Sequence, residues 1–265
     1  MIYNIRIKRY LPGVKQVTTY SREKQRGKAS PLKGRKKAKI DINELDPDQF
    51  IRRLNKCVNN STRRTVNMIY DIARSNVWEW FITFTFNPDL VDSFDYVTCC
   101  KKLKNWIDNV MRSSGQNVKY LAVPELHKSG RIHFHMLVSG IDLIMNDSGH
   151  KTKSGLTIYN LGQYRWGFTT AIQVYETNGI SKYICKYITK ELIATTKGKR
   201  RYWASKSVDR PVEEVFYTRH LDTNNEVYSS MPDMVYTKAI ERKNTQGKTM
   251  ETIRYFEYEK ELVNE

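Results

Sequence analysis

The middle of the chain contains four runs of apolar residues that predict β-strands. VWEWFITFTFNPD at 77–89 is aromatic and β-branched and ends in Asn-Pro-Asp, which is typical of a buried strand followed by a turn. The segments 118–126, 131–140 and 167–176 have the same character, and polar and apolar positions alternate strictly about the two histidines of 131–140. The polar, glycine-containing segment 140–160 is interpreted as a loop.

Apolar residues at helical spacing predict helices on both sides of the first strand. Two helices are expected before it, over about 47–57 and 61–75, with Ser61 or Thr62 as the N-cap of the second. A third helix is expected over 93–115, where the apolar positions repeat every three to four residues and the run ends at a glycine.

The order of these elements predicts the fold class. After the strand at 167–176, an Asn-Gly turn leads into ISKYICKYITKELIA at 180–194, which is predicted to form one helix. RRYWASKSVDRP at 200–211 is expected to add a further strand. The order strand, helix, strand, strand, loop, strand, helix indicates an α+β fold: an antiparallel sheet of about five strands with helices on one face.

Positive charge is concentrated in the first forty residues. The chain has a net charge of +17, and residues 1–40 hold thirteen basic residues against one acidic residue. The stretch SREKQRGKASPLKGRKKAK at 21–39 has almost no large apolar side chains, so it lacks the apolar face of a membrane-binding helix. We interpret it as an extended basic arm that binds nucleic-acid phosphates, the alternative being a solvated tail with no specific role.

Three parts of the chain are therefore expected. They are a basic N-terminal arm over 1–45, a folded domain over 46–215, and a basic, polar C-terminal extension of unknown role over 216–265. The candidate DNA-binding residues are the basic side chains of the arm and of the segments beside the predicted strands: Arg35, Lys36, Lys37, Lys39, Arg131, Lys199, Arg200 and Arg201.

The cysteines and the apolar runs indicate the cellular compartment. The four cysteines lack zinc-ligand spacing and two are adjacent, so we interpret them as reduced thiols. No run approaches the roughly 18 apolar residues needed to span a bilayer, and the N-terminus does not resemble a secretion signal. A cytoplasmic location without a membrane partner is expected.

Three histidines lie close together in PELHKSGRIHFH at 124–135. Because side chains alternate along a strand, His133 and His135 share one face, and a hairpin can bring Glu125 of the preceding strand beside them. Two imidazoles and one carboxylate leave open positions on a metal ion, as catalytic sites require. The alternative is that these histidines only form hydrogen bonds on a polar face. His127 remains open as a fourth ligand, a DNA contact or a surface residue.

Two tyrosines follow in the segment predicted to be helical. On one helix, Tyr183 and Tyr187 are four residues apart, so both phenols project from the same face. Each is followed three residues later by a lysine, Lys186 or Lys190, whose charge can favour the nucleophilic phenolate or hold a DNA phosphate. The alternative is a tyrosine-bearing core stripe with solvated lysines.

Taken together and in this order, the motifs resemble those of the HUH endonucleases. WFITFTFNPD is similar to the first motif of that family, GRIHFHMLVSG to its metal motif and YICKYITK to its tyrosine motif. The doubled tyrosine resembles the two-tyrosine replication initiators of small single-stranded DNA phages and plasmids. The segment 200–211 is similar to one that follows the tyrosine helix in the filamentous-phage and microvirus branch. The resemblance covers about residues 60–211.

The resemblance implies a fold, a chemistry and partners. The fold is the ferredoxin- or RRM-like α+β fold of HUH endonucleases. Mg²⁺ or Mn²⁺ is expected on His133, His135 and Glu125, and Tyr183 or Tyr187 is expected to attack origin DNA, which gives a 5′-phosphotyrosine and a 3′-hydroxyl that primes rolling-circle replication. The partners implied are single-stranded origin DNA and, in a bacterial host, a helicase and a polymerase. The chain has no Gly-x-x-x-x-Gly-Lys-Ser/Thr phosphate loop of its own.

Two other functions are compatible with the sequence. One is an HUH relaxase or transposase, which uses the same chemistry for a different task. The other is a basic nucleic-acid-binding protein without enzymatic activity, in which the histidines and tyrosines are structural. Metal dependence of DNA nicking distinguishes that second class from the enzymes.

Overall fold

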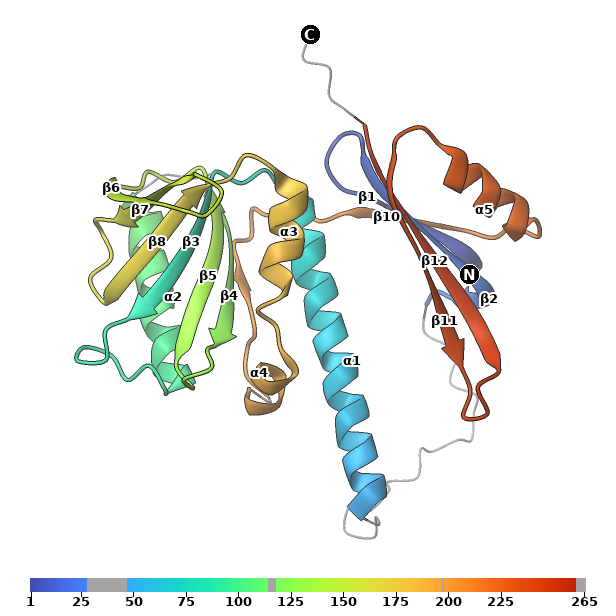
Figure 1. Ribbon diagram of the computed structural model, residues 1–265, viewed down its shortest axis with the longest axis horizontal. Coiled ribbons are helices and arrows are strands. Elements are labelled where there is room, and N and C mark those ends of the chain that lie inside the picture. The colour runs from blue at the N-terminus through green and yellow to red at the C-terminus, as the bar shows by residue number, and fades with distance from the viewer. Residues whose placement is uncertain (28–46, 114–117, 197, 261–265) are drawn as a thin grey trace. The chain divides into compact units, whose positions relative to one another are not determined.

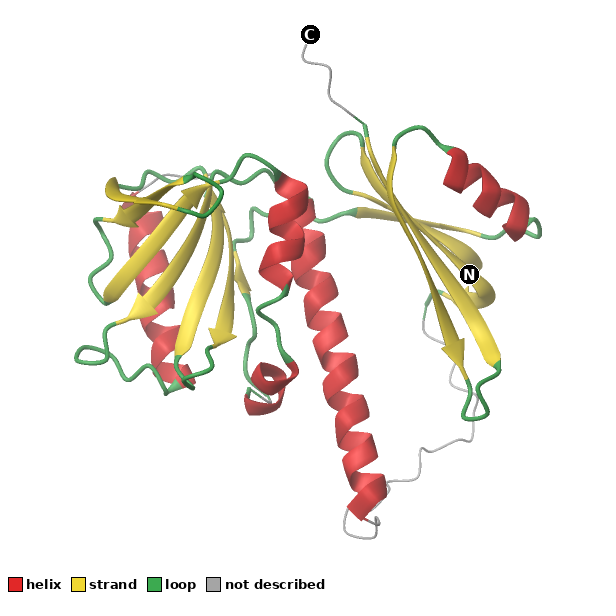
Figure 2. Ribbon diagram, viewed as in Figure 1, coloured by secondary structure: helices red, strands yellow, loops and turns green. Residues whose placement is uncertain are grey.

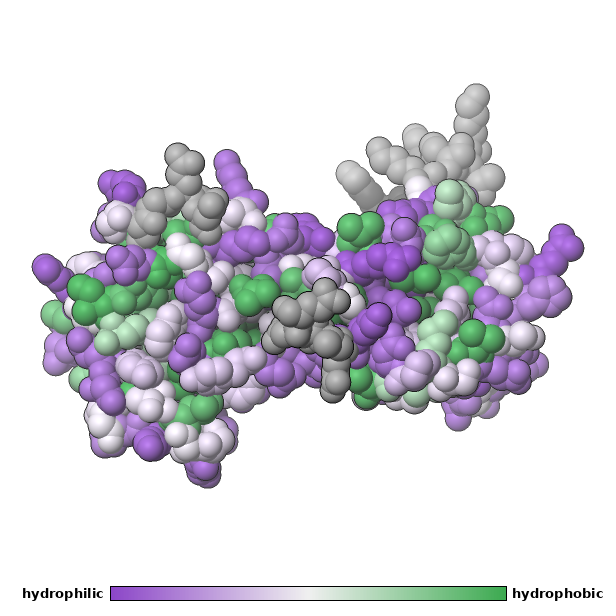
Figure 3. Space-filling model, turned by 90° about the horizontal axis from the view of Figure 1, so that it is seen from above, coloured by the Kyte–Doolittle hydropathy of each residue, from purple (hydrophilic) through white to green (hydrophobic). Residues whose placement is uncertain are grey.

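A computed structural model describes residues 1–27, 47–113, 118–196 and 198–260 of the protein. The chain divides into two compact units (Figure 1), a larger one over Ile42–Asp209 and a smaller one built from both ends of the chain. None of the described helices combines the length and apolar character needed to cross a membrane. On the face seen in Figure 3, hydrophilic side chains predominate and hydrophobic patches are small.

The larger unit is built on a seven-stranded sheet with antiparallel neighbours in the order β6-β7-β8-β3-β5-β4-β9 (Figure 2). The α+β class and the antiparallel sheet predicted from the sequence are therefore confirmed, although the sheet has seven strands and not about five. The strands are β3 (Trp80–Phe86), β4 (Lys119–Leu126), β5 (Ile132–Ser139), β6 (Met145–Lys151), β7 (Thr157–Leu161), β8 (Gly167–Gln173) and β9 (Trp203–Ala204).

Helix residues cover both faces of this sheet, and not one face as predicted. On one face, Phe84 of β3 contacts Trp106 with ring centroids 5.0 Å apart. On the other, Phe81 contacts Tyr183 at 5.5 Å. Both faces of β5 are largely buried, which explains why a one-sided arrangement is insufficient. The helices are α1 (Pro47–Arg74), α2 (Tyr96–Ser113), α3 (Thr177–Cys185) and α4 (Lys190–Thr195).

The predicted loop over 140–160 is instead the hairpin of β6 and β7. Its strand β6 lies at the sheet edge, where most side chains are solvent-exposed, so the residues are polar and carry no apolar alternation. Backbone pairing of β7 with β8 and the contact of Tyr159 with Trp80, whose ring centroids lie 5.3 Å apart, attach the hairpin to the sheet. A strand of this kind is not visible in hydrophobic periodicity.

The two helices predicted before β3 are one continuous helix, α1. The predicted cap residues lie in its interior, where the Thr62 hydroxyl donates to the carbonyl of Val58 one turn earlier. Ser61 accepts a hydrogen bond from Arg201 at 2.6 Å and so contributes to tertiary contacts. Ser and Thr often cap helices but also occupy helix interiors when their hydroxyls bond the preceding turn.

The smaller unit joins the two ends of the chain in a five-stranded antiparallel sheet of order β10-β1-β2-β12-β11. Its core is small and consists of Ile5, Val17, Phe256 and Tyr258, and the Tyr258 hydroxyl donates to the Tyr228 carbonyl of α5 at 2.7 Å. The elements are β1 (Ile2–Arg9), β2 (Val14–Gln25), β10 (Val212–Phe216), α5 (Leu221–Ser230), β11 (Met234–Lys243) and β12 (Thr249–Glu259).

This sheet corrects the prediction of an extended arm over 1–45. Residues 2–25 form β1 and β2, and several of their basic side chains pair with acids from the C-terminal end: Arg9 with Glu214 at 2.9 Å, and Lys24 with the buried Glu251. The C-terminal extension predicted over 216–265 supplies α5, β11 and β12 of the same unit. Four predicted DNA contacts of the arm lie outside the described residues: Arg35, Lys36, Lys37 and Lys39.

Candidate active site

The candidate metal ligands lie side by side on two adjacent strands of the larger sheet, β4 and β5, and β3 flanks them. In the register, Glu125 of β4 is opposite His133 of β5, and His133 is opposite Thr85 of β3. His135 is opposite Thr83, one step further along the same face. Because directly opposed residues share a face of the sheet, the structure brings the two imidazoles and the carboxylate together.

Glu125 and His135 are joined directly. The Oε2 atom of Glu125 lies 2.7 Å from Nε2 of His135, whose side chain is only 4% exposed. This hydrogen bond lowers the pKa of Glu125, and burial lowers the pKa values of His135 and His133. At neutral pH the carboxylate is therefore ionised and the imidazoles are neutral, which is the state that metal ligands require.

Threonine hydroxyls of β3 hold the other nitrogen of each imidazole. Thr83 Oγ1 lies 3.1 Å from Nδ1 of His135, and Thr85 Oγ1 lies 3.3 Å from Nδ1 of His133. A hydroxyl can donate or accept, so it can satisfy Nδ1 in either tautomer of the ring. These contacts fix the ring orientation and direct each Nε2 away from β3, as the outer partners of metal-binding histidines do.

Within the described part of the chain, no group of three His, Cys, Asp or Glu side chains already has the geometry to hold a metal ion. The donor chemistry nevertheless suits a divalent cation, because two nitrogens and a carboxylate oxygen share one face. Neighbouring ligands of an octahedral Mg²⁺ lie about 3 Å apart. The Glu125 Oε2 and His135 Nε2 atoms lie 2.7 Å apart, which is close to that spacing.

His127 is not placed as a ready fourth ligand. Its ring stacks on His133 with centroids 5.1 Å apart. Its Nδ1 accepts the backbone N–H of Ser129 at 3.2 Å, so in the neutral ring the proton lies on Nε2. In this tautomer, Nε2 of His127 is a hydrogen-bond donor beside the site.

The tyrosine segment is not one continuous helix. The helix α3 ends at Cys185, the backbone N–H of Lys186 bonds the Tyr183 carbonyl, and Thr189 caps the separate helix α4 through the N–H of Leu192. Tyr187 therefore lies in the turn between the two helices. The i, i+4 helical relation predicted for the tyrosines is wrong, although their rings still meet edge to face at 5.5 Å.

The two phenols have different environments. Tyr183 is 43% exposed and contacts Phe81, whereas Tyr187 is 7% exposed and stacks on the His135 ring with centroids 3.4 Å apart. Partial burial raises the pKa of Tyr183, but hydrogen bonds with Lys186 and Tyr187 outweigh it and lower the pKa overall. Burial and the hydrogen bond to Tyr183 raise the pKa of Tyr187. Tyr183 is therefore the more accessible and the more easily ionised phenol.

Only one of the two predicted lysines lies at the phenols. The Nζ atom of Lys186 is 3.4 Å from the ring centroid of Tyr183 and 5.1 Å from that of Tyr187. Lys190 is exposed at the start of α4, and among the described groups that shift the two phenol pKa values Lys186 is the only lysine. The structure thus places Lys186, and not Lys190, beside the candidate nucleophile.

The predicted DNA contacts in the larger unit separate into two kinds. Arg131 lies over the exposed ring of Phe94 at 5.7 Å, and exposed Lys199 lies over Tyr96 at 5.6 Å. Arg200 is exposed, and its carbonyl accepts a hydrogen bond from Tyr96. Arg201 instead donates to Ser61 from a partly buried position, so its main contacts are structural.

The threonines of β3 are site residues that the sequence interpretation missed. In WFITFTF, Thr83 and Thr85 occupy alternate positions of a strand that is otherwise apolar or aromatic. Polar residues at period two within a buried strand mark a face with a polar function. The alternation of Thr83 and Thr85 has the same period of two as that of His133 and His135. This shared alternation could have indicated the threonines as site residues.

One comparison with known protein families matches the region that contains the site. Residues 79–192 match the family model of the replication-associated proteins of the ORF2 type. The matched segment contains Glu125, both metal-motif histidines and both tyrosines, and it lies within the larger unit. Comparisons with curated proteins and with solved structures give no match. This part of the chain is therefore similar to replication-associated proteins.

Proposed function

We propose that the protein is a metal-dependent DNA endonuclease and strand transferase that nicks single-stranded DNA at a replication origin and initiates rolling-circle replication. One observation carries the proposal. The imidazole of the Glu125–His135 pair stacks on Tyr187, and Tyr187 contacts the more exposed Tyr183, whose pKa is lowered. A nucleophile next to a cation-binding donor set is the arrangement that phosphodiester transfer needs. The similarity to replication-associated proteins supports the biological task.

In the proposed first step, the Tyr183 oxygen attacks the scissile phosphorus. The new bond joins the Tyr183 oxygen to the 5′-phosphate of the nucleotide downstream of the cut, and the bond that breaks is that from phosphorus to the 3′ oxygen of the upstream nucleotide. The phenol proton is lost and the 3′ oxygen gains one, so a 3′-hydroxyl is released. Lys186 stabilises the phenolate before attack, because its ammonium group contacts the ring and lowers the phenol pKa.

His133, His135 and Glu125 are the residues that would hold Mg²⁺ or Mn²⁺. A divalent ion bound there would polarise the scissile phosphate and offset its charge. Thr83 and Thr85 orient the two imidazoles through hydrogen bonds to their Nδ1 atoms. Glu125 contributes a negative charge that attracts the cation, and as an ionised carboxylate it is in the state that binds a metal.

Tyr187 is proposed as the second nucleophile. It must leave its stack on His135 before it can react, and loss of stacking and burial costs roughly 2–4 kcal/mol. Because of this cost, Tyr187 is expected to react only after Tyr183 has made the first cut. When Tyr183 is esterified, attack by Tyr187 on the regenerated origin releases a second 3′-hydroxyl, and that hydroxyl can displace Tyr183 to close a circle. Each exchange conserves the bond energy, so rejoining needs no ATP.

The proposed partners are single-stranded origin DNA and a host helicase and polymerase. The released 3′-hydroxyl is the primer that a polymerase extends. A host helicase is the proposed source of strand separation, because the 265 residues contain no phosphate loop for ATP hydrolysis.

A nicking assay with single-stranded origin DNA and Mn²⁺ tests the proposal. Wild-type protein is expected to give a nicked product and a protein–DNA adduct that survives denaturation, and EDTA should abolish both. His133→Ala and His135→Asn should lose cleavage and ion binding. His150→Ala is the matched control, because His150 is an exposed histidine of β6. Cleavage by the His133 and His135 variants at the wild-type rate would refute the metal assignment.

A further inference from the structure

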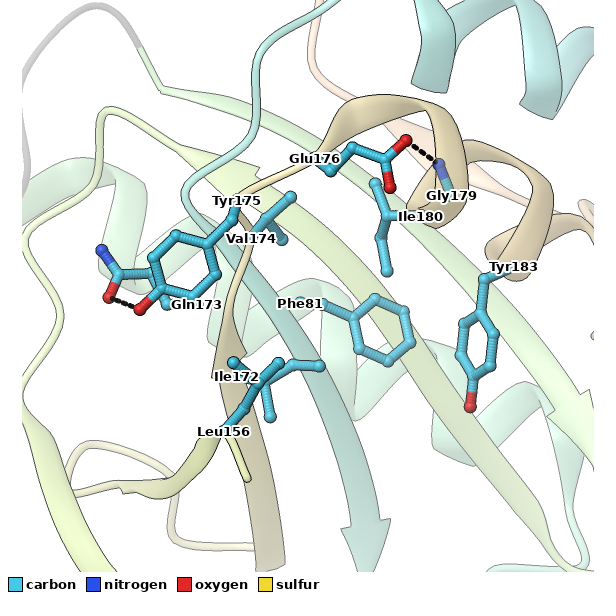
Figure 4. A pocket seen from close by; sticks show the side chains of 10 residues that line it. All are labelled: Phe81, Leu156, Ile172, Gln173, Val174, Tyr175, Glu176, Gly179, Ile180 and Tyr183. Carbon is cyan, nitrogen blue, oxygen red and sulfur yellow. Dashed lines mark hydrogen bonds between the residues drawn. The ribbon is translucent and has the colours of Figure 1, made fainter. Parts of the chain in front are cut away.

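A pocket of about 370 Å³ opens beside the Tyr183 ring in the larger unit. Figure 4 shows Tyr183 on one side of the pocket, Phe81 and Ile172 at its base, and Tyr175 on the opposite side. Leu156 also contributes to the lining. The pocket is thus a mainly apolar recess with aromatic rings on several sides.

The aromatic side chain at the far side of the pocket is exposed but held in place. Tyr175 is 74% exposed, yet its hydroxyl donates to Oε1 of Gln173 at 2.9 Å (Figure 4). An exposed tyrosine anchored in this way presents its ring face to a ligand with little loss of conformational freedom on binding. Burying this ring against a flat ligand would remove a large apolar surface from water.

The position of the pocket limits what can occupy it. Tyr183 is both a wall of the pocket and the residue proposed to attack a DNA phosphate. A phosphate at the Tyr183 oxygen therefore places an adjoining nucleotide of the same strand at the pocket opening. Small-ligand pockets span roughly 300–1,000 Å³, and a volume near the lower limit suits a single planar group.

We propose that this pocket binds one unstacked nucleobase of the single strand, next to the phosphate that Tyr183 attacks. The proposal rests on the proposed function for the identity of the strand. Stacking on Tyr175 and contact with Phe81 and Ile172 hold the base, and this fixes the backbone so that the phosphate faces Tyr183. Base–aromatic stacking is a general mode of single-strand recognition and tolerates every base.

Binding measurements on two probes test the proposal without any cleavage. The probes are a short labelled oligothymidylate and an abasic oligomer of the same length, titrated in EDTA at one salt concentration. Both carry the same phosphates, so the ratio of their dissociation constants isolates the contribution of the bases. The proteins compared are the full-length wild type, Tyr175→Ala, Tyr175→Phe and Tyr217→Ala. Tyr217 is the matched control because it is an exposed tyrosine of the smaller unit.

Tyr175→Ala should reduce the preference for the base-bearing probe by about fivefold to a hundredfold, the range of one base stack. Tyr175→Phe keeps the ring and should keep most of the preference, and Tyr217→Ala should keep all of it. Because Tyr175 is exposed, thermal melting of the alanine variant should match wild type. An unchanged probe ratio in Tyr175→Ala, or an equal loss in Tyr217→Ala, would overturn the proposal.

The same measurements separate failure of the pocket from failure of the proposed function. If Tyr175→Ala loses the base preference but wild-type protein never nicks DNA in Mn²⁺, the pocket binds bases and the endonuclease assignment is wrong. If wild-type protein nicks DNA but the probe ratio does not respond to Tyr175→Ala, the enzyme is correct and the base is held elsewhere.

Discussion

The two units of the protein differ in how their strands are brought together. The larger unit is one continuous segment of the chain, Ile42–Asp209. Within it, β4 pairs with the next strand, β5, and β3 pairs with both β5 and β8. The smaller unit pairs β2 with β12, from opposite ends of the chain. Hydrophobic periodicity identifies buried strands but not distant partners, so the central strands of the larger unit could be predicted and the sheet of the smaller unit could not.

The difference extends to charge and core size. The larger unit has an extensive core, whereas the smaller depends on Ile5, Val17, Phe256 and Tyr258. Basic residues near the N-terminus suggested a solvated arm because their acidic partners, such as Glu214 and Glu251, lie near the other end of the chain. A charge count over one segment cannot show pairing with another.

The largest expected effect is that of deleting residues 1–27. This removes β1 and β2, the two strands that join β10 to β12, and half of the small core. We expect the smaller unit to unfold completely, while the larger unit keeps its own melting transition because its sheet and core lie within Ile42–Asp209. Calorimetry of the full chain, the deletion variant and the isolated 42–209 segment measures this.

Loss of both transitions in the deletion variant would show that the larger unit depends on the smaller. The isolated 42–209 segment should also bind DNA more weakly than the full chain, with a shallower salt dependence, because it lacks the basic residues of positions 1–41. Nicking of a saturating oligonucleotide should survive, since the candidate site lies within the larger unit.

A smaller effect is expected for Thr85→Val, which tests whether the sheet register of the larger unit supports the site. The substitution removes the hydroxyl that contacts Nδ1 of His133 and keeps the shape of the side chain. Loss of such an outer partner lowers metal affinity by about 10- to 100-fold. Titration with Mn²⁺ measures it, and Thr170→Val, an exposed threonine of β8, is the control. Equal Mn²⁺ affinities for the Thr85 variant and wild type would contradict the orienting role.

The smallest effect is expected for Lys186→Ala, and it depends on pH. Burial raises the pKa of Tyr183, and Lys186 lowers it. Without the lysine, the pKa of Tyr183 should therefore rise, so that less phenolate is present at neutral pH. The nicking rate should fall roughly tenfold for each unit of that rise, and the rate–pH profile should move to higher pH. Lys190→Ala should leave the profile in place, because Lys190 does not shift either phenol pKa. Equal shifts in the two variants would indicate a general charge effect.

Much of the candidate site was predictable because strand geometry is regular. The alternation of His133 and His135 and the short turn after Glu125 were sufficient to predict their common face, and the register agrees. The break after Cys185 was not predictable from apolar spacing, because Ile184 and Ile188 keep the helical period across it. The unequal burial of the two tyrosines depends on tertiary packing against the sheet. It could not be predicted from the sequence, because both tyrosines stand in the same Tyr-x-x-Lys motif.

The central claim is that Tyr183 makes the first covalent bond to DNA, and peptide mapping tests it most directly. Trypsin cleaves after Lys182, Lys186 and Lys190, so the two tyrosines fall on separate peptides, 183–186 and 187–190. With excess protein over linear origin DNA in Mn²⁺, we predict that the nucleotide adduct is on 183–186, is lost in Tyr183→Phe and persists in Tyr187→Phe. An adduct on 187–190 in wild-type protein, or an undiminished adduct in the double Tyr→Phe variant, would contradict the claim.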